Sequence, residues 1–288
     1  MAAPADPEPA PLIDVARLRA RLDEPELRLL DARFDLADPE AGLRAFLAGH
    51  LPGARYVHLE RELSGHGRPA SEGRHPLPAP DAFAATLARL GITLATPVVV
   101  YDAAGGALAA ARAWWLLRWM GHLRVQVLDG GWQAWCAAGG PVVSGPEPAV
   151  VAEAGTPHWR PGSLPVLGAA AVAALPPGQV LVDARAPERY RGEVEPIDSR
   201  AGHIPGALNR PFAENLEAGR FKSPERLRAE WSALLPAGAQ PVLYCGSGVT
   251  ACHNALALVL AGFPAPALFP PSWSGWIADP VHPVAKGV

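Results

Sequence analysis

The chain contains two copies of one ordered set of sequence motifs. The pairs are LLDARFD (29–35) and LVDARAP (181–187), GHLPGA (49–54) and GHIPGA (202–207), PVVVYD (97–102) and PVLYC (241–245), and Trp132 with Trp135 against Trp273 with Trp276. The order of the motifs is kept, whereas the spacing between them differs. A repeat of this length indicates two duplicated domains with different loops and excludes a short-period solenoid.

A Gly- and Pro-rich stretch separates the two copies. It reads GGPVVSGPEPAVVAEAGTPHWRPGSLP and shows no sustained periodicity, which is typical of a linker. We therefore expect a first domain over residues 11–143, a linker over 144–163 and a second domain over 164–288.

Within each copy, short β-rich runs alternate with helical patterns. PVVVY and QVLVD are examples of the first, and AAARAWWLLRWMG and PDAFAATLARLG are examples of the second, with Gly91 and Gly121 at the expected C-caps. Alternation of this kind predicts an α/β fold in which each domain is a mostly parallel sheet with helices on both faces. Functional sites of such sheets lie at the carboxyl ends of the strands.

Composition excludes several classes of partner. The net charge is −3 and the sequence holds no basic run, which argues against nucleic acid and anionic membranes as partners. The N-terminus MAAPADPEPAP has neither a cationic start nor an apolar run, so the sequence predicts no signal peptide and no membrane span. Three irregularly spaced cysteines indicate neither a disulfide framework nor a metal site, and we expect a reducing, cytoplasmic compartment and no cofactor.

Cys245 stands where a functional site is expected. It follows the strand at 241–244 and precedes an apolar stripe typical of an amphipathic helix, formed by Val249, Cys252, Leu256, Val259 and Leu260. The turn between strand and helix consists of Gly246, Ser247, Gly248, Val249 and Thr250. Its glycines allow several N–H groups to point at one centre at a helix N-terminus, where they would stabilise a thiolate. The alternative is a buried structural thiol.

The other two cysteines differ from Cys245 in their surroundings. Cys252 lies on the apolar stripe and Cys136 lies beside Trp135, so both are expected to pack in the core; a resolving thiol is the alternative for Cys252. A cysteine-dependent phosphatase would need an arginine six positions after Cys245, and the residue there is Ala251. Phosphate-ester hydrolysis therefore loses support, and a sulfur-accepting thiolate remains.

The whole chain resembles the tandem-domain sulfurtransferases of the rhodanese family. The resemblance rests on the GHIPGA pair, on WWLLRWMGHLRVQVLDGGW at 114–132 and on CGSGVT at 245–250. It implies two tandem rhodanese-like domains, of which 11–143 is non-catalytic and 164–288 is catalytic. Asp102 occupies in the first domain the position that Cys245 occupies in the second, and an aspartate cannot carry a sulfane sulfur.

Within the family, the loop CGSGVT resembles that of the 3-mercaptopyruvate sulfurtransferases. A neutral loop also suits a singly charged donor better than doubly charged thiosulfate. By the same resemblance Arg185 binds the donor carboxylate; the alternative for Arg185 is a salt bridge that orders the loop. The family's second carboxylate-binding arginine is replaced by Ile197, which makes Arg200 the substitute candidate.

The resemblance also implies a proton relay to the loop serine. Ser247 and His75 match its serine and histidine, whereas its aspartate is replaced by Gly65; a surface or interface histidine is the alternative for His75. His50 and His203 are expected to be structural, because each precedes a Pro-Gly turn whose backbone groups an imidazole can bind.

The activity implied is the transfer of a sulfane sulfur from 3-mercaptopyruvate, through a persulfide on Cys245, to a thiol or cyanide, with release of pyruvate. The acceptor thiol would be a protein such as thioredoxin or a small thiol. Two alternatives stay open, namely a thiosulfate:cyanide sulfurtransferase and a non-catalytic persulfide-carrier or binding module.

Overall fold

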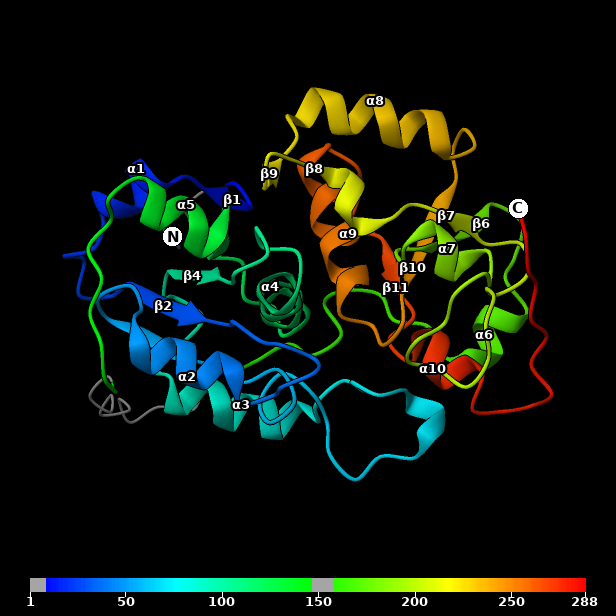
Figure 1. Cartoon of the computed structure of the whole chain (residues 1–288), viewed down its shortest axis with the longest axis horizontal. Helices are drawn as coiled ribbons and strands as arrows, with labels where there is room; N and C mark the ends of the chain where they lie inside the picture. Colours follow the sequence, from blue (N-terminus) through cyan, green and yellow to red (C-terminus); the bar gives the residue numbers. More distant parts are fainter. Residues whose placement is uncertain (1–8, 147–157) are drawn as a thin grey trace, which may run out of the picture.

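The computed structural model describes residues 9–146 and 158–288, which form two α/β domains joined by one continuous core (Figure 1). The first domain is built on a parallel sheet with the strand order β1-β5-β4-β2-β3. Its strands are β1 (Leu12–Ile13), β2 (Arg28–Asp31), β3 (Ala54–Tyr56), β4 (Val98–Tyr101) and β5 (Val125–Leu128). Its helices are α1 (Val15–Arg19), α2 (Ala41–Ala48), the 3-10 turn η1 (Ala70–Glu72), α3 (Pro80–Arg89), α4 (Ala109–Trp119) and α5 (Gly131–Ala137).

Helices cover both faces of this sheet because its central strands carry apolar residues on both faces. Leu29 and Val99 pack in a core with side chains of α1, α2 and α5. Their neighbours Leu30 and Val100 point to the opposite face and pack with α3 and α4. Continuous apolar strands of this kind are typical of a parallel sheet buried on both sides, as the sequence predicted.

The second domain repeats this plan with a parallel sheet of the order β11-β10-β6-β7 and a small antiparallel hairpin, β8–β9. Its strands are β6 (Gln179–Asp183), β7 (Leu208–Asn209), β8 (Leu216–Glu217), β9 (Arg220–Phe221), β10 (Gln240–Tyr244) and β11 (Ala267–Leu268). Its helices are α6 (Ala169–Ala173), α7 (Pro187–Tyr190), the 3-10 turn η2 (Phe212–Asn215), α8 (Pro224–Leu234), α9 (Thr250–Leu260) and α10 (Ser272–Trp276). The predicted fold class is therefore confirmed.

The two domains meet where α4 packs against α9 (Figure 1). Every residue of α4 except Arg118 is buried, and α9 is buried from Ala251 to Leu258. The expectation of an amphipathic α9 is thus wrong, because α4 covers the face that an isolated domain would expose to water. The helix that carries the Cys245 loop at its N-terminus is held by both domains.

Each domain also packs one segment against the other domain. The turn η1 of the first domain packs against α10 of the second. In return, the hairpin β8–β9 docks on the first domain, where the Phe221 amide donates a hydrogen bond of 2.9 Å to Asp129 Oδ1. This exchange brings first-domain residues near η1 close to the Cys245 loop.

Several local expectations can be compared with the structure. Gly91 and Gly121 follow α3 and α4 with φ of +68° and +85°, as their predicted C-cap positions require. The centre of the predicted linker, residues 147–157, lies outside the described residues, and the domain boundaries stay a prediction. Across the described residues, no helix combines the length and the apolarity that a membrane crossing requires.

Candidate active site

The loop after β10 places Cys245 at the carboxyl end of the second sheet. Cys245 is only 2% exposed, and its amide donates a hydrogen bond of 3.1 Å to Ser272 Oγ. The turn closes at Gly248, whose φ of +80° favours glycine. A Cβ atom there would lie 2.5 Å from the Pro270 carbonyl oxygen, so no other residue fits without moving the chain.

One backbone amide of this turn binds the sulfur, and others have no partner within the described chain. The Gly248 N–H donates to Cys245 Sγ at 3.1 Å. Within the described chain, the N–H groups of Gly246, Ser247 and Val249 have no hydrogen-bond acceptor. Buried N–H groups are nearly always paired, so this turn at the start of α9 is suited to an anion such as a thiolate or a persulfide.

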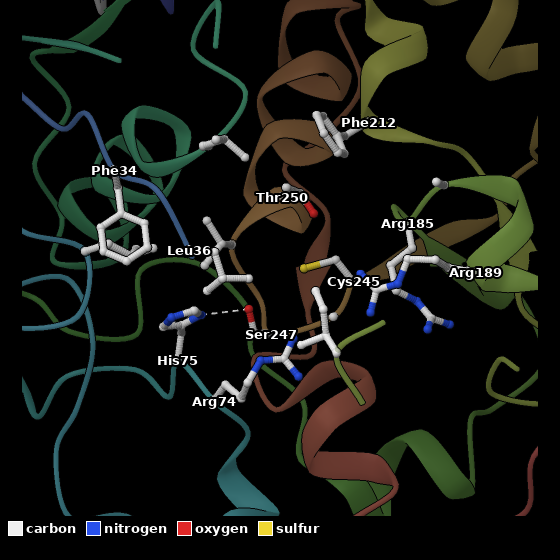
Figure 2. Close-up of a pocket in the computed structure, with 16 residues that line it drawn as sticks. Phe34, Leu36, Arg74, His75, Arg185, Arg189, Phe212, Cys245, Ser247 and Thr250 are labelled. Carbon is white, nitrogen blue, oxygen red and sulfur yellow. Dashed lines mark hydrogen bonds between the residues drawn. The ribbon is translucent and has the colours of Figure 1, made fainter. Parts of the chain in front are cut away.

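A cavity of about 230 Å³ opens in front of Cys245 and is lined from both domains (Figure 2). Gly246, Ser247, Val249 and Thr250 form its floor together with Cys245. The walls combine apolar side chains such as Phe34, Leu36 and Phe212 with three arginines, Arg74, Arg185 and Arg189. A largely apolar pocket with a few convergent polar groups is typical of a small-molecule site.

Ser247 and His75, which the resemblance implied as partners in a proton relay, meet at the edge of this cavity. His75 Nδ1 lies 2.7 Å from Ser247 Oγ (Figure 2). Burial, with the nearby Arg112 and Arg74, lowers the pKa of His75 from 6.5 to about 4, so the ring is neutral near pH 7. The 3.9 Å approach of Glu60 to His75 Nε2 is therefore a polar contact of a neutral ring and not an ion pair.

The structure explains why Gly65 cannot be an aspartate. Its amide donates to the Pro76 carbonyl at 2.9 Å, and a Cβ atom at Gly65 would lie 2.7 Å from the Leu77 carbonyl oxygen. The acidic group closest to His75 Nε2 comes instead from Glu60, whose side chain is 43% exposed.

Arg185 lines the cavity, but protein groups occupy most of its donors. It makes a bidentate pair with Asp183, donates to the Gly202 carbonyl at 2.6 Å and to Glu195 at 3.3 Å, and stacks 4.7 Å from the centre of the Trp273 ring. Its counterpart in the first domain repeats all but one of these contacts. Arg33 pairs with Asp31, donates to the Gly49 carbonyl at 2.6 Å and stacks 4.3 Å from the Trp132 ring. Because Arg33 does this where no cysteine is present, these shared contacts favour the structural alternative for Arg185.

Two arginines that the sequence reasoning missed lie against the loop. A Cβ atom built on Gly246 would be 3.1 Å from Arg74 Nη2 and 3.7 Å from Arg189 Nη1. Arg189 lies four residues after Arg185 on α7, and Arg74 is the sequence neighbour of His75, so adjacency to residues already singled out was the available signal. Arg200, the proposed substitute for the arginine missing at Ile197, is not part of the lining; its Nη1 donates to the His282 carbonyl at 3.3 Å.

A third missed arginine holds the loop from behind. Arg112 of α4 is fully buried, and its guanidinium donates to the carbonyl groups of Leu63, His75, Pro76 and Gly248 at 3.0 to 3.3 Å. Desolvation lowers the pKa of Arg112. No sequence motif pointed to Arg112, which lies in the helical pattern of α4 outside the motifs that were singled out.

The remaining cysteines and histidines have structural surroundings. Cys252 is buried, its Sγ donates to the Gly248 carbonyl at 3.3 Å, and burial raises its pKa to about 12, which favours packing over a resolving role. The expectation for Cys136 is wrong: it is exposed, because α5 turns that side away from Trp135 and the sheet. His50 and His203 each bind a backbone carbonyl through Nδ1, at 2.7 and 2.8 Å.

Over residues 9–146 and 158–288, no group of three or more His, Cys, Asp or Glu side chains is placed to hold a metal ion.

Comparison with known proteins identifies the same kind of domain in both halves of the chain. The family model of the Rhodanese-like domain matches residues 14–138 and 169–279. A probable 3-mercaptopyruvate sulfurtransferase of Pseudomonas aeruginosa is 49% identical, with 96% of this chain and 99% of the relative covered. A putative thiosulfate sulfurtransferase, SseB of Mycobacterium tuberculosis, is 43% identical over 96% of this chain and 97% of that protein. The crystal structure of SseA from Escherichia coli, one of the 3-mercaptopyruvate sulfotransferases, superposes with a TM-score of 0.79 at 30% identity, with 92% of this chain and 99% of SseA covered.

Proposed function

This chain belongs to the rhodanese family, and from that premise we propose that it transfers a sulfane sulfur from 3-mercaptopyruvate, through a persulfide on Cys245, to a thiol or to cyanide. The observation that carries the proposal is the open turn at Cys245, with one N–H on Sγ and others lacking acceptors in the described chain. This arrangement suits a group that gains a second, negatively charged sulfur.

In the first half-reaction, the Cys245 thiolate attacks the sulfur of the donor. The bond between that sulfur and its carbon breaks, and the electron pair passes to the carbon as the enolate of pyruvate. The thiol proton of the donor is taken up through Ser247 and neutral His75 and returned to the enolate carbon, so Cys245 is left as a persulfide anion and pyruvate departs.

In the second half-reaction, the acceptor attacks the outer sulfur of the persulfide. The bond between the two sulfurs breaks, its electrons return to Cys245 as a thiolate, and the sulfur leaves on the thiol or as thiocyanate. The N–H groups of the turn stabilise the anion on Cys245 before and after this step. We place the acceptor among protein thiols such as thioredoxin or small thiols. We place the protein in the cytoplasm, because its three free cysteines fit a reducing compartment.

We assign the binding of the donor carboxylate to arginines that line the cavity. Arg189 and Arg74 lie closest to Gly246, and their side chains are 17% and 29% exposed, whereas that of Arg185 is 2% exposed and its donors are largely used. We therefore assign the carboxylate chiefly to Arg189 and Arg74, and Arg185 to the support of Glu195 behind them.

Steady-state sulfur transfer from 3-mercaptopyruvate and thiosulfate, measured side by side with cyanide as acceptor, tests this function. We expect 3-mercaptopyruvate to be preferred and the Cys245→Ser variant to lose at least about 1,000-fold of the rate. Cys136→Ser is the matched control, because Cys136 is exposed and is not part of the cavity. Intact mass should show one added sulfur on the wild type and on Cys136→Ser, but not on Cys245→Ser.

The alternatives have distinct outcomes in this assay. A preference for thiosulfate would identify the chain as a thiosulfate sulfurtransferase, an activity named for the M. tuberculosis relative. A persulfide that forms on Cys245 only by exchange with another protein, with no turnover of either donor, would indicate a carrier module.

A further inference from the structure

An ion-pair bridge crosses the domain interface at the mouth of the cavity. Asp198, in the segment after α7 of the second domain, pairs with Arg74, which the first domain contributes between η1 and α3. The same carboxylate accepts from Arg189 Nη2 at 3.2 Å. The side chain of Asp198 is only 5% exposed, so this bridge is largely removed from solvent screening.

The charges of the three arginines that line the cavity are balanced by their carboxylate partners. Three guanidinium groups line the cavity, those of Arg74, Arg185 and Arg189. Three carboxylates pair with them, namely Asp183 and Glu195 on Arg185, Glu195 and Asp198 on Arg189, and Asp198 on Arg74. The cluster thus presents hydrogen-bond donors with no net charge, which favours a monoanion over a dianion in a poorly solvated site.

Arg74 keeps donors free for a ligand. Its Nε is buried and has no hydrogen-bond partner in the described part of the chain, and its Nη2 lies beside Gly246. The absent side chain of Gly246 provides the room for this approach. A buried donor without an acceptor is destabilising unless a ligand supplies the acceptor. The unpartnered Nε and the position of Nη2 therefore indicate that Arg74 binds an anion next to Cys245.

We propose that Asp198 determines donor selectivity: by neutralising Arg74 and Arg189 it makes the site select a singly charged carboxylate donor and reject thiosulfate, while Arg74, supplied by the first domain, binds that carboxylate. This inference rests on the proposed function, because it assumes that Cys245 accepts sulfur in this cavity. It also explains the neutral loop: selectivity is set by the residues facing Gly246 rather than by residues within the loop.

The test is the ratio of kcat/KM for thiosulfate to kcat/KM for 3-mercaptopyruvate, with cyanide as the common acceptor. Asp198→Asn keeps the shape of the side chain and changes the cluster from neutral to a charge of +1, so the ratio should rise by about tenfold or more. Asp38→Asn is the matched control, since Asp38 also pairs with an arginine but lies on the exposed surface near Arg44, and its ratio should equal that of the wild type.

A second variant keeps the proposal testable if Asp198→Asn does not fold. Arg74→Gln changes the cluster to a charge of −1. We expect the KM for 3-mercaptopyruvate to rise about tenfold and the ratio of kcat/KM for thiosulfate to kcat/KM for 3-mercaptopyruvate to fall below that of the wild type. The double variant Arg74→Gln/Asp198→Asn restores neutrality, so its ratio should return toward that of the wild type even though its KM stays high. A role of the bridge in folding alone would change kcat/KM for both donors by the same factor and leave the ratio constant.

Different results would overturn the proposed function and the proposed role of Asp198. If the wild type acquires no sulfur on Cys245 from either donor, the proposed function is wrong. If the wild type is active and the ratio stays constant in both Asp198→Asn and Arg74→Gln, the proposed function stands and the role of Asp198 is overturned.

Discussion

The loops at Asp102 and at Cys245 occupy equivalent positions of the two domains, but they differ in what satisfies their backbone amides. In the first domain the Asp102 carboxylate accepts from the N–H groups of Ala104, Gly106, Leu108 and Ala110 at 2.8 to 3.2 Å. In the second domain one N–H reaches Cys245 Sγ, and others in the described turn have no acceptor. The same fold therefore holds a built-in carboxyl acceptor in one copy and leaves room for a transferred group in the other.

The two loops are also physically connected. The helix that follows the Asp102 loop is α4, and its Arg112 donates to the carbonyl of Gly248 in the Cys245 loop at 3.1 Å. The closed first-domain loop thus anchors the helix that holds the open one. This connection gives the first domain a mechanical role in addition to its contribution of Arg74 and His75.

Replacement of Arg112 by Met is expected to have the largest effect on this arrangement. The change leaves buried carbonyl groups of both domains without a donor, and we expect the free energy of unfolding to fall by about 3 to 5 kcal/mol. Denaturant unfolding would measure this loss, with Arg44→Met as a surface control that should change stability by less than about 0.5 kcal/mol.

Arg112 is a positioning residue, and a second readout distinguishes this role from support of the fold alone. The rate of alkylation of Cys245 as a function of pH should change in Arg112→Met and be partly restored in Arg112→Lys, which keeps the charge. An alkylation profile identical to that of the wild type would show that Arg112 supports the fold without affecting the loop.

Replacement of Asp102 by Ala tests whether the first loop depends on its internal carboxyl acceptor. The four N–H groups would lose their acceptor in a buried site, and we expect a loss of about 2 to 3 kcal/mol in the free energy of unfolding. Asp35→Ala is the matched control, because exposed Asp35 accepts a single N–H, from Ala37 at 2.8 Å, and should cost below about 1 kcal/mol. Equal losses for the two variants would mean that the Asp102 carboxylate does not stabilise its loop.

The repeat made much of this comparison predictable from the sequence. Aligned motifs place Asp102 against Cys245 and Arg33 against Arg185, and the apolar strands indicate sheets buried on both faces. Local signals such as Gly91 and Gly121 were sufficient for helix ends because backbone conformation at a C-cap depends on neighbouring residues.

The parts that were missed depend on the docking of the two domains. Arg74 and Arg112 act on a loop that is distant in sequence, and the burial of α9 on all sides arises only when α4 covers it. Arg185 was assigned to the substrate by resemblance. Its structural role became clear only from the spatial comparison with Arg33, which makes most of the same contacts. Sequence patterns report on one element at a time, and these features belong to pairs of elements.

Acidification should destabilise both domains through buried neutral histidines, with the smallest effect per site. Burial lowers the pKa of His122 in the first domain to about 4 and that of His253 in the second to about 3, from 6.5. The unfolded chain therefore binds more protons than the folded one as the pH falls below 6.5, and the free energy of unfolding should fall by up to about 1.4 kcal/mol per pH unit for each histidine. His122 Nδ1 accepts from the Arg124 amide at 3.0 Å, so protonation there would also break a hydrogen bond that His122→Asn can retain.

Denaturant unfolding between pH 6.5 and 5 would measure these slopes, since most carboxylates stay ionised in that range. His122→Asn and His253→Asn should each reduce the slope, and the double variant should reduce it by the sum, because one histidine lies in each domain and neither contacts the other. Slopes that do not change in either variant would show that the acid sensitivity comes from other groups. A reduction in only one variant would mean that the fold disfavours protonation of one of these two histidines much more strongly than protonation of the other.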